Sequence, residues 1–122
     1  MKLFAALGSL NALLAVAAGA FCAHALKGYV PADRLTVFEV GARYHMFHAL
    51  GFFAVAWLAD RGAPGATAAG ALMLAGIVVF SGSLYLLAIT GARWLGAVTP
   101  LGGLLLLAAW ALLAWSALRL GR

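Results

Sequence analysis

The sequence predicts an all-α integral membrane protein, an antiparallel four-helix bundle that forms a single transmembrane domain over residues 1–122. The first observation behind this prediction is composition: 66% of the residues are hydrophobic and 9% are charged, with a mean hydropathy of +1.07. A soluble domain has roughly 45–50% apolar and about 25% charged residues. The second is that the apolar residues gather into four stretches. Because a soluble fold of this length leaves much of its surface exposed to water, a bilayer is the solvent that these stretches fit.

The distribution of charge argues against nucleic-acid binding. The net charge is +5 and the pI is near 10.2, but the basic residues stand one or two at a time near the ends of the apolar stretches, without a basic stripe. Basic residues in such places are typical of topology signals and of contacts with anionic lipid. We therefore expect the lipid bilayer as a partner. The single cysteine excludes an intramolecular disulfide.

The first apolar stretch, residues 3–23, is interrupted only by Ser9 and Asn11. Its length of about 21 residues covers the hydrocarbon core of roughly 30 Å at about 1.5 Å per residue. Asn11 is the one amide in this span, and we expect it to form a hydrogen bond between helices rather than a ligand site.

The second stretch begins with a polar interfacial helix start, residues 31–36, and continues as a span over residues 37–58. Pro31 suits the first turn of a helix, where its missing N–H is no loss. Asp33 then lies near the positive end of the helix dipole. A helix of this length exceeds the hydrocarbon core, so its first turns are expected in the headgroup region.

Residues 60–65 combine charge with Gly and Pro and predict a turn. The third span follows over residues 66–89. It is rich in Ala and Gly and carries three polar residues, Ser81, Ser83 and Tyr85.

The fourth span is predicted over residues 100–118. Residues 91–94 read as a short interfacial turn in which Trp94 suits the aromatic belt of the membrane. Thr99 is the expected N-cap of the last helix, with Pro100 at its first position. Short loops between four spans imply antiparallel neighbours and place both termini on one side.

Four motifs, in order along the chain, resemble those of the transmembrane-protein-256-like family, also known as domain of unknown function 423. They are GAFCAHALK at 19–27, YHMFHAL at 44–50, FSGSLY at 80–85 and TPLGG at 99–103. The resemblance covers nearly the whole chain. It implies a small four-helix membrane protein and no established biochemical activity. Two positions depart from the family pattern: Cys22 stands in place of Gly, and His45 stands where Gln is frequent.

The reactive side chains concentrate at the junction between the first two spans. We predict a polar cluster or ligand-binding site there, with further residues from the third span: His24, His48, Tyr44, Glu39, Arg43, Ser81, Ser83 and Tyr85. Ionisable residues near membrane spans are costly and suggest function. The simplest role for His24 and His48 is a hydrogen bond to a carbonyl or hydroxyl across the helix interface, with Tyr44, Ser81, Ser83 and Tyr85 as candidate partners. Glu39 and Arg43 are spaced for an i,i+4 ion pair.

A metal or haem site is an alternative reading of the same residues. His24 and His48 suffice in number as axial haem ligands if both rings face one cavity. A copper or zinc site could draw on Cys22, His24, His45 and His48, with Met46 nearby. A site that needed Cys22 or His45 would be peculiar to this chain, because both depart from the family pattern. We predict no cofactor.

We predict a non-enzymatic membrane protein, an interaction module or one that binds lipid or another small ligand. No nucleophile–base–orienter set and no nucleotide or metalloprotease motif is visible. A small dimeric transporter is the second alternative, but such a protein would carry a carboxylate deep in a span. Here Asp33, Glu39 and Asp60 all lie near span ends. Both readings are compatible with a homo-oligomer or with another membrane protein as a partner.

The expected location is the cell (inner) membrane, with the termini in the cytoplasm. Basic residues are evenly divided: Lys2, Arg61, Arg119 and Arg122 on the terminal side, and Lys27, Arg34, Arg43 and Arg93 on the other. Counting the terminal amine, and discounting Arg43 because of its expected pairing with Glu39, favours cytoplasmic termini.

Overall fold

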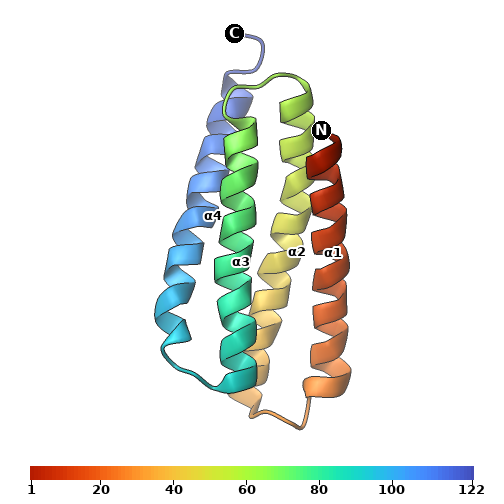
Figure 1. Ribbon diagram of the computed structural model, residues 1–122, viewed down its shortest axis with the longest axis vertical. Coiled ribbons are helices and arrows are strands. Elements are labelled where there is room, and N and C mark those ends of the chain that lie inside the picture. Colours follow the sequence, from red (N-terminus) through yellow and green to blue (C-terminus); the bar gives the residue numbers. More distant parts are fainter.

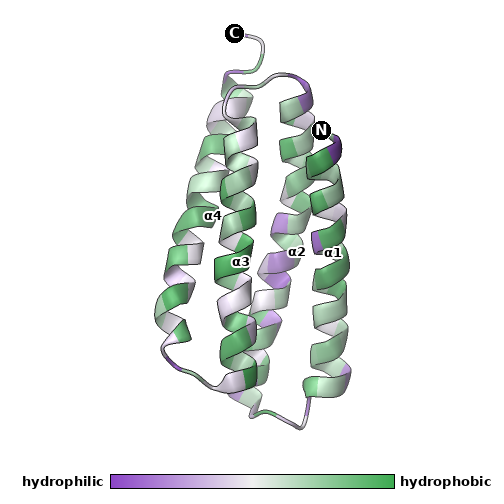
Figure 2. Cartoon of the chain, in the orientation of Figure 1, coloured by the Kyte–Doolittle hydropathy of each residue, from purple (hydrophilic) through white to green (hydrophobic).

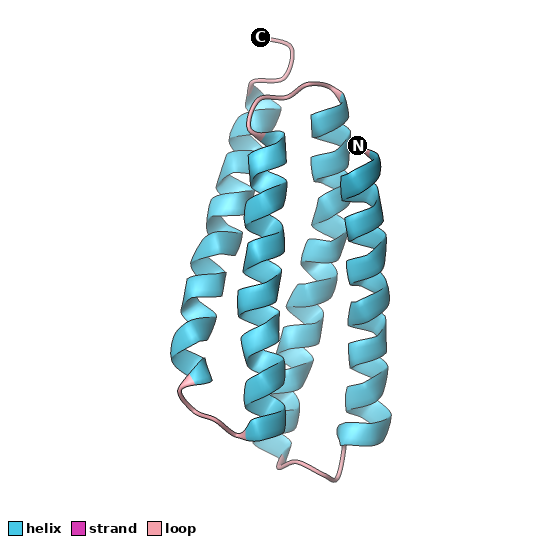
Figure 3. Cartoon of the chain, viewed as in Figure 1, coloured by secondary structure: helices cyan, strands magenta, loops and turns pink.

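A computed structural model describes all residues, 1–122. It consists of four long α-helices: α1 (Lys2–Phe21), α2 (Ala32–Asp60), α3 (Ala66–Thr90) and α4 (Leu95–Leu118). A five-residue π-helical segment, Cys22–Leu26, extends α1. Successive helices run antiparallel and are joined by short loops, and both termini lie at the same end of the molecule (Figures 1 and 3). The predicted all-α four-helix bundle is confirmed.

The helices pack in the order of the chain. The three large interfaces join α1 to α2, α2 to α3, and α3 to α4, whereas α2 and α4 touch at few points. In Figure 1 α1 and α4 accordingly form the two sides of the molecule, with α2 and α3 between them. The bundle is therefore open between its first and last helices, and α2 is the helix with the most buried residues.

The core consists of two apolar clusters separated by polar side chains. The larger cluster is built around Phe52, Val55 and Met73 near the α2–α3 turn. The smaller one surrounds Cys22 and Phe38 near the α1–α2 loop. The buried histidines of α2 come between Phe38 and Phe52 in sequence and hence between the two clusters along the bundle. In Figure 2 the hydrophilic colour is likewise concentrated in the middle of α2.

The outer surface is apolar. Many large hydrophobic side chains are exposed, among them Leu3, Leu13, Leu104, Leu107 and Leu118. Three helical segments are long and apolar enough to cross a membrane: Lys2–Leu26, Ala66–Thr90 and Leu95–Leu118. The same measure does not select α2, whose first half carries four charges. That α2 also crosses the membrane stays a prediction, supported by its position between α1 and α3.

Most predicted helix boundaries agree with the structure to within two residues, but the start of the fourth helix was predicted wrongly. Thr99 is not an N-cap, because α4 begins five residues before Pro100, at Leu95. In the first turn of α4, the backbone amides of residues 95, 96 and 97 donate hydrogen bonds to the carbonyls three residues earlier. The Thr99 hydroxyl instead donates to the Leu95 carbonyl (3.2 Å). Pro100 within the helix removes a single backbone donor.

Two turns rely on glycine in the left-handed region, where side chains with a Cβ are strained. The α2–α3 turn contains Gly62 (φ 70°) and Gly65 (φ 80°), as its composition predicted. Gly91 (φ 71°) ends α3. These turns are short enough to hold consecutive helices side by side.

Candidate functional site

The middle of α2 presents two histidines to different neighbours. His45 and His48 are both buried, each with 6% of its surface exposed. His48 lies 16 residues beyond the start of α2, roughly 24 Å along the helix at about 1.5 Å per residue. The predicted position at the loop end is therefore wrong for His48, which lies near the midpoint of the bundle together with His45.

His45 belongs to a chain of hydrogen bonds that joins three helices. Its Nε2 lies 2.9 Å from Oδ1 of Asn11 in α1, and its Nδ1 lies 2.9 Å from the hydroxyl of Tyr85 in α3. The Asn11 amide nitrogen donates to the Leu7 carbonyl (2.8 Å), which leaves its oxygen to accept. His45 Nε2–H must therefore donate to Asn11, and Nδ1 accepts from Tyr85. Every ring nitrogen of His45 is satisfied, and the interhelical role expected for Asn11 is confirmed.

His48 is bonded on one side only. Its Nδ1 lies 2.6 Å from the backbone carbonyl of Tyr44, one turn earlier in α2. A carbonyl can only accept, so Nδ1 carries a proton, and in the neutral imidazole Nε2 keeps a free lone pair. No protein group donates to Nε2 among the side-chain hydrogen bonds. This nearly buried imidazole therefore keeps an acceptor that no protein group pairs.

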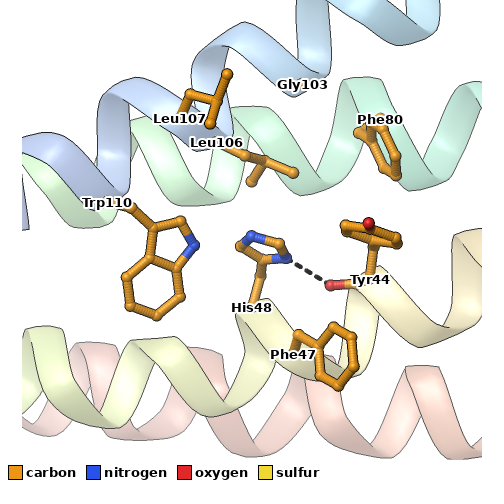
Figure 4. Close-up of a pocket in the computed structure, with 8 residues that line it drawn as sticks. All are labelled: Tyr44, Phe47, His48, Phe80, Gly103, Leu106, Leu107 and Trp110. Atoms are coloured by element: carbon orange, nitrogen blue, oxygen red, sulfur yellow. Dashed lines mark hydrogen bonds between the residues drawn. The ribbon is translucent and has the colours of Figure 1, made fainter.

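The surroundings of His48 form a groove between α2 and α4 over α3 (Figure 4). Its volume is about 430 Å³, within the usual range of small-ligand sites. Eight residues line it, and six of them are hydrophobic. The eight are Tyr44, Phe47, His48, Phe80, Gly103, Leu106, Leu107 and Trp110. We call this the His48 groove. The lining residues recur at helical spacing on α2 and on α4, so two facing stripes make its walls.

The groove is closed at one end by Trp110. The indole reaches across to α2, where it packs over Gly51, and its ring centroid lies 5.9 Å from that of His48. Figure 4 shows the indole nitrogen turned toward His48. At the other end, Tyr44 packs against Phe80 with centroids 5.0 Å apart. Phe47 and Leu107 are more than half exposed, so the groove opens sideways, toward lipid.

These groups define what the groove can do chemically. It offers an apolar and aromatic wall, one acceptor at His48 Nε2, one donor at the Trp110 indole N–H, and the Tyr44 hydroxyl. It contains no carboxylate, thiol or lysine. The arrangement suits reversible binding of an apolar molecule with a small polar group.

The predicted serines serve helix packing. Ser81 donates to the Gly41 carbonyl of α2 (2.8 Å), and the Ser83 hydroxyl lies 2.6 Å from that of Thr99 in α4. Both serines are buried. They tie α3 to its two neighbours, and neither lines the His48 groove.

Three other predicted residues stand apart from the histidines of α2. His24, in the π-helical segment, is exposed and is not a lining residue of the groove. Glu39 and Arg43 are exposed, and the ion pair expected between them is not formed within 4 Å. The prediction of one cluster is thus wrong: the structure separates it into the His48 groove, the His45 chain and isolated surface residues.

The histidines proposed as paired ligands do not share a cavity. No group of three or more His, Cys, Asp or Glu side chains lies close enough to hold a metal ion. Cys22 is buried and its thiol lies 3.8 Å from the Leu35 carbonyl, near the α1–α2 loop. His45 and His48 share one helix but direct their ring nitrogens to different partners. The alternative that needs His24 and His48 around one haem therefore has no support in the geometry.

Sequence reasoning missed the α4 wall of the groove. None of the four residues of this wall, Gly103, Leu106, Leu107 and Trp110, is among the site residues predicted from the sequence. Leu106, Leu107 and Trp110 lie three, four and seven residues after Gly103. This helical spacing is the signal that could have revealed one helix face with a gap at the glycine. What it could not reveal is that this face meets His48.

The chain resembles known proteins along nearly its whole length. A family described as "Protein of unknown function (DUF423)" matches residues 18–103. A UPF0382 membrane protein of Bacillus subtilis, YwdK, is 52% identical over 98% of each chain. A UPF0382 membrane protein of Staphylococcus saprophyticus is 44% identical, covering 93% of this chain and 94% of its own. No solved structure matches.

Proposed function

Because this chain belongs to the DUF423 family of membrane proteins, whose function is unknown, we propose a function from its own geometry: it binds an amphipathic, lipid-like ligand in the His48 groove. One observation carries the proposal. A histidine that is only 6% exposed directs a free acceptor into an apolar groove of about 430 Å³. Buried polar groups are normally paired, and here the missing partner can come from a ligand.

The groove is accessible from the bilayer. Its wall includes the exposed side chains of Phe47 and Leu107, and it lies where α2 and α4 touch at few points. A ligand dissolved in the membrane could enter sideways without passing through water. The short loops supply no lid and no soluble domain, which fits a binding or interaction role rather than catalysis.

We propose that the protein lies in the cell membrane with both termini in the cytoplasm. The distribution of its basic residues supports this orientation. On the opposite side, Arg34 is half-buried and its guanidinium lies against Gly91, at the negative end of the α3 dipole. With Arg34 engaged in the fold, and with the terminal amine counted, the terminal side has more free positive charge. The wide apolar faces of α1 and α4 also leave room for a second copy or another membrane protein.

The test uses a pair of glycine substitutions. Gly103→Leu would fill the groove, because a Cβ there has only Phe80 nearby, at 3.9–4.0 Å. Gly82→Leu is the matched control, since its Cβ would meet nothing within 4 Å and it lies outside the groove. The purified proteins are extracted with organic solvent and the bound amphiphiles are quantified by mass spectrometry.

We expect a stoichiometric amphiphile in the wild type and in Gly82→Leu, and its loss in Gly103→Leu. Identical lipid profiles in all three proteins would overturn the proposal. An absorption spectrum and elemental analysis of the same samples test the cofactor alternatives. A Soret band, or stoichiometric copper or zinc that is lost in His48→Ala, would replace the lipid-like ligand by haem or metal.

A further inference from the structure

The hydrogen-bonding direction at His48 restricts the ligand. The Tyr44 carbonyl, 2.6 Å away, holds a proton on Nδ1, so in the neutral imidazole Nε2 can only accept. A ligand group that pairs with Nε2 must bring its own hydrogen. A hydroxyl meets this need, whereas an ether, an ester carbonyl or a ketone does not. The neighbouring indole N–H of Trp110 can then donate to the same ligand oxygen or to another acceptor.

The shape of the groove favours a flat ring beside that hydroxyl. The rings of Tyr44 and His48 are nearly parallel (16°) with centroids 6.2 Å apart, and those of His48 and Trp110 are 5.9 Å apart. With Phe47 and Phe80, four of the eight lining residues have Phe, Tyr or Trp side chains. Aromatic rings pair at centroid distances of about 4.5–7 Å, so a bound ring would have several partners.

The volume also fits a ring with an apolar tail. An apolar cavity of about 150 Å³ can hold one benzene molecule, and the groove has about 430 Å³. The remaining space opens toward lipid beside Leu107, which is 67% exposed. A head group in the groove could therefore keep its tail in the bilayer.

We infer that the His48 groove selects an amphiphile with a phenolic hydroxyl, the chemistry shared by alkylphenols and by membrane quinols. The hydroxyl donates to His48 Nε2, the ring packs among the aromatic side chains, and the tail leaves between α2 and α4. The reduced quinol is favoured over the quinone, because quinone oxygens bring no hydrogen to Nε2. This inference rests on the proposed ligand-binding function and specifies its ligand.

The experiment compares a phenol with its methyl ether, in which a methyl group replaces the hydroxyl hydrogen and removes the donor. The full chain in phosphatidylcholine nanodiscs is titrated with 4-nonylphenol and with its methyl ether, and binding to empty nanodiscs is subtracted. We expect the phenol to bind at least tenfold more tightly than the ether. His48→Phe should abolish this preference, and His24→Phe, at an exposed histidine outside the groove, should keep it. Circular dichroism and size-exclusion chromatography check that both variants fold.

The outcomes separate the inference from the function on which it rests. Equal saturable binding of phenol and ether, lost in Gly103→Leu, would overturn the hydroxyl requirement and leave the amphiphile-binding function standing. Saturable binding of neither would overturn the phenolic ligand, and the lipid extraction then decides the function. If the folded His48→Phe variant keeps the preference, His48 is not the acceptor and the inference is wrong.

A second pair of probes distinguishes the two sources of the hydroxyl. Duroquinol and duroquinone are titrated under anaerobic conditions that keep each in its redox state. Tighter binding of duroquinol, lost in His48→Phe, would support membrane quinols as the ligands. A preference for nonylphenol over its ether without a preference for duroquinol would support simple phenols instead.

Discussion

At the scale of single residues, two histidines three positions apart in α2 have different surroundings. His45 faces α1 and α3, where Asn11 and Tyr85 satisfy both of its ring nitrogens. His48 faces the groove toward α4 and is satisfied on one nitrogen only. Residues three apart on a helix differ by about 60° in direction. This difference is enough for the two side chains to face different helices. Burial alone would not distinguish the two, since both are 6% exposed.

The His45 chain should contribute measurably to stability. Tyr85→Phe removes the hydroxyl that donates to His45 Nδ1 and leaves a buried acceptor unpaired. We expect a loss of about 1 kcal/mol in the free energy of unfolding, in the range of interhelical hydrogen bonds in membranes. Unfolding in a series of detergent mixtures, followed by circular dichroism, measures the change. Tyr29→Phe is the control, because Tyr29 is 86% exposed and its change should be neutral. Equal stability of Tyr85→Phe and the wild type would show that the chain is not a stabilising contact.

At the scale of helices, adjacent glycines of α4 have unequal roles. A Cβ on Gly102 would lie 2.4 Å from the backbone nitrogen of Phe80 and 2.7 Å from its Cα. A Cβ on Gly103 would lie no closer than 3.9 Å to any atom of Phe80. Gly102 is thus the position where α3 and α4 approach each other, and Gly103 is where the groove has its space.

This difference gives a prediction with a built-in control. Gly102→Ala should force α3 and α4 apart and reduce the free energy of unfolding by roughly 1–3 kcal/mol, the cost typical of overpacking. Gly103→Ala should be close to neutral. Thermal unfolding of both variants in the same detergent compares them directly. If Gly103→Ala were the more destabilising of the two, the packing described for α3 and α4 would be wrong.

How far the sequence predicts these elements depends on the range of the interaction. The turn at residues 60–65 and the four apolar stretches are local properties, and the structure has a turn and four helices at these places. The start of α4 was misplaced because Thr99 and Pro100 resemble a helix start locally, while the structure uses Thr99 to contact Ser83. The groove depends on which face of α4 meets His48, and that pairing of distant residues is invisible to spacing along one helix.

At the scale of the whole molecule, the four antiparallel helices give the bundle two different ends. Both termini lie at one end, and the loop that contains Tyr29 lies at the other (Figure 1). In a Cys22→Ala background, which removes the only thiol, Tyr29→Cys and Arg122→Cys should react with a membrane-impermeant maleimide from opposite sides. With cytoplasmic termini, Tyr29→Cys reacts in intact cells and Arg122→Cys only after permeabilisation. Reaction of both from the same side would contradict the four-span topology.

The packing of consecutive helices bears on how the protein is made. Since each large interface joins a helix to the one synthesised just before it, assembly can follow translation without waiting for a distant partner. α1 is apolar enough to enter a bilayer alone, and α2 is not selected by that measure. When α2 is synthesised, α1 is already in the bilayer, and Asn11 of α1 can accept the hydrogen bond from His45. We therefore expect α1 to act as an intramolecular chaperone for the membrane insertion of α2. A shortened α1 should leave α2 at the membrane surface.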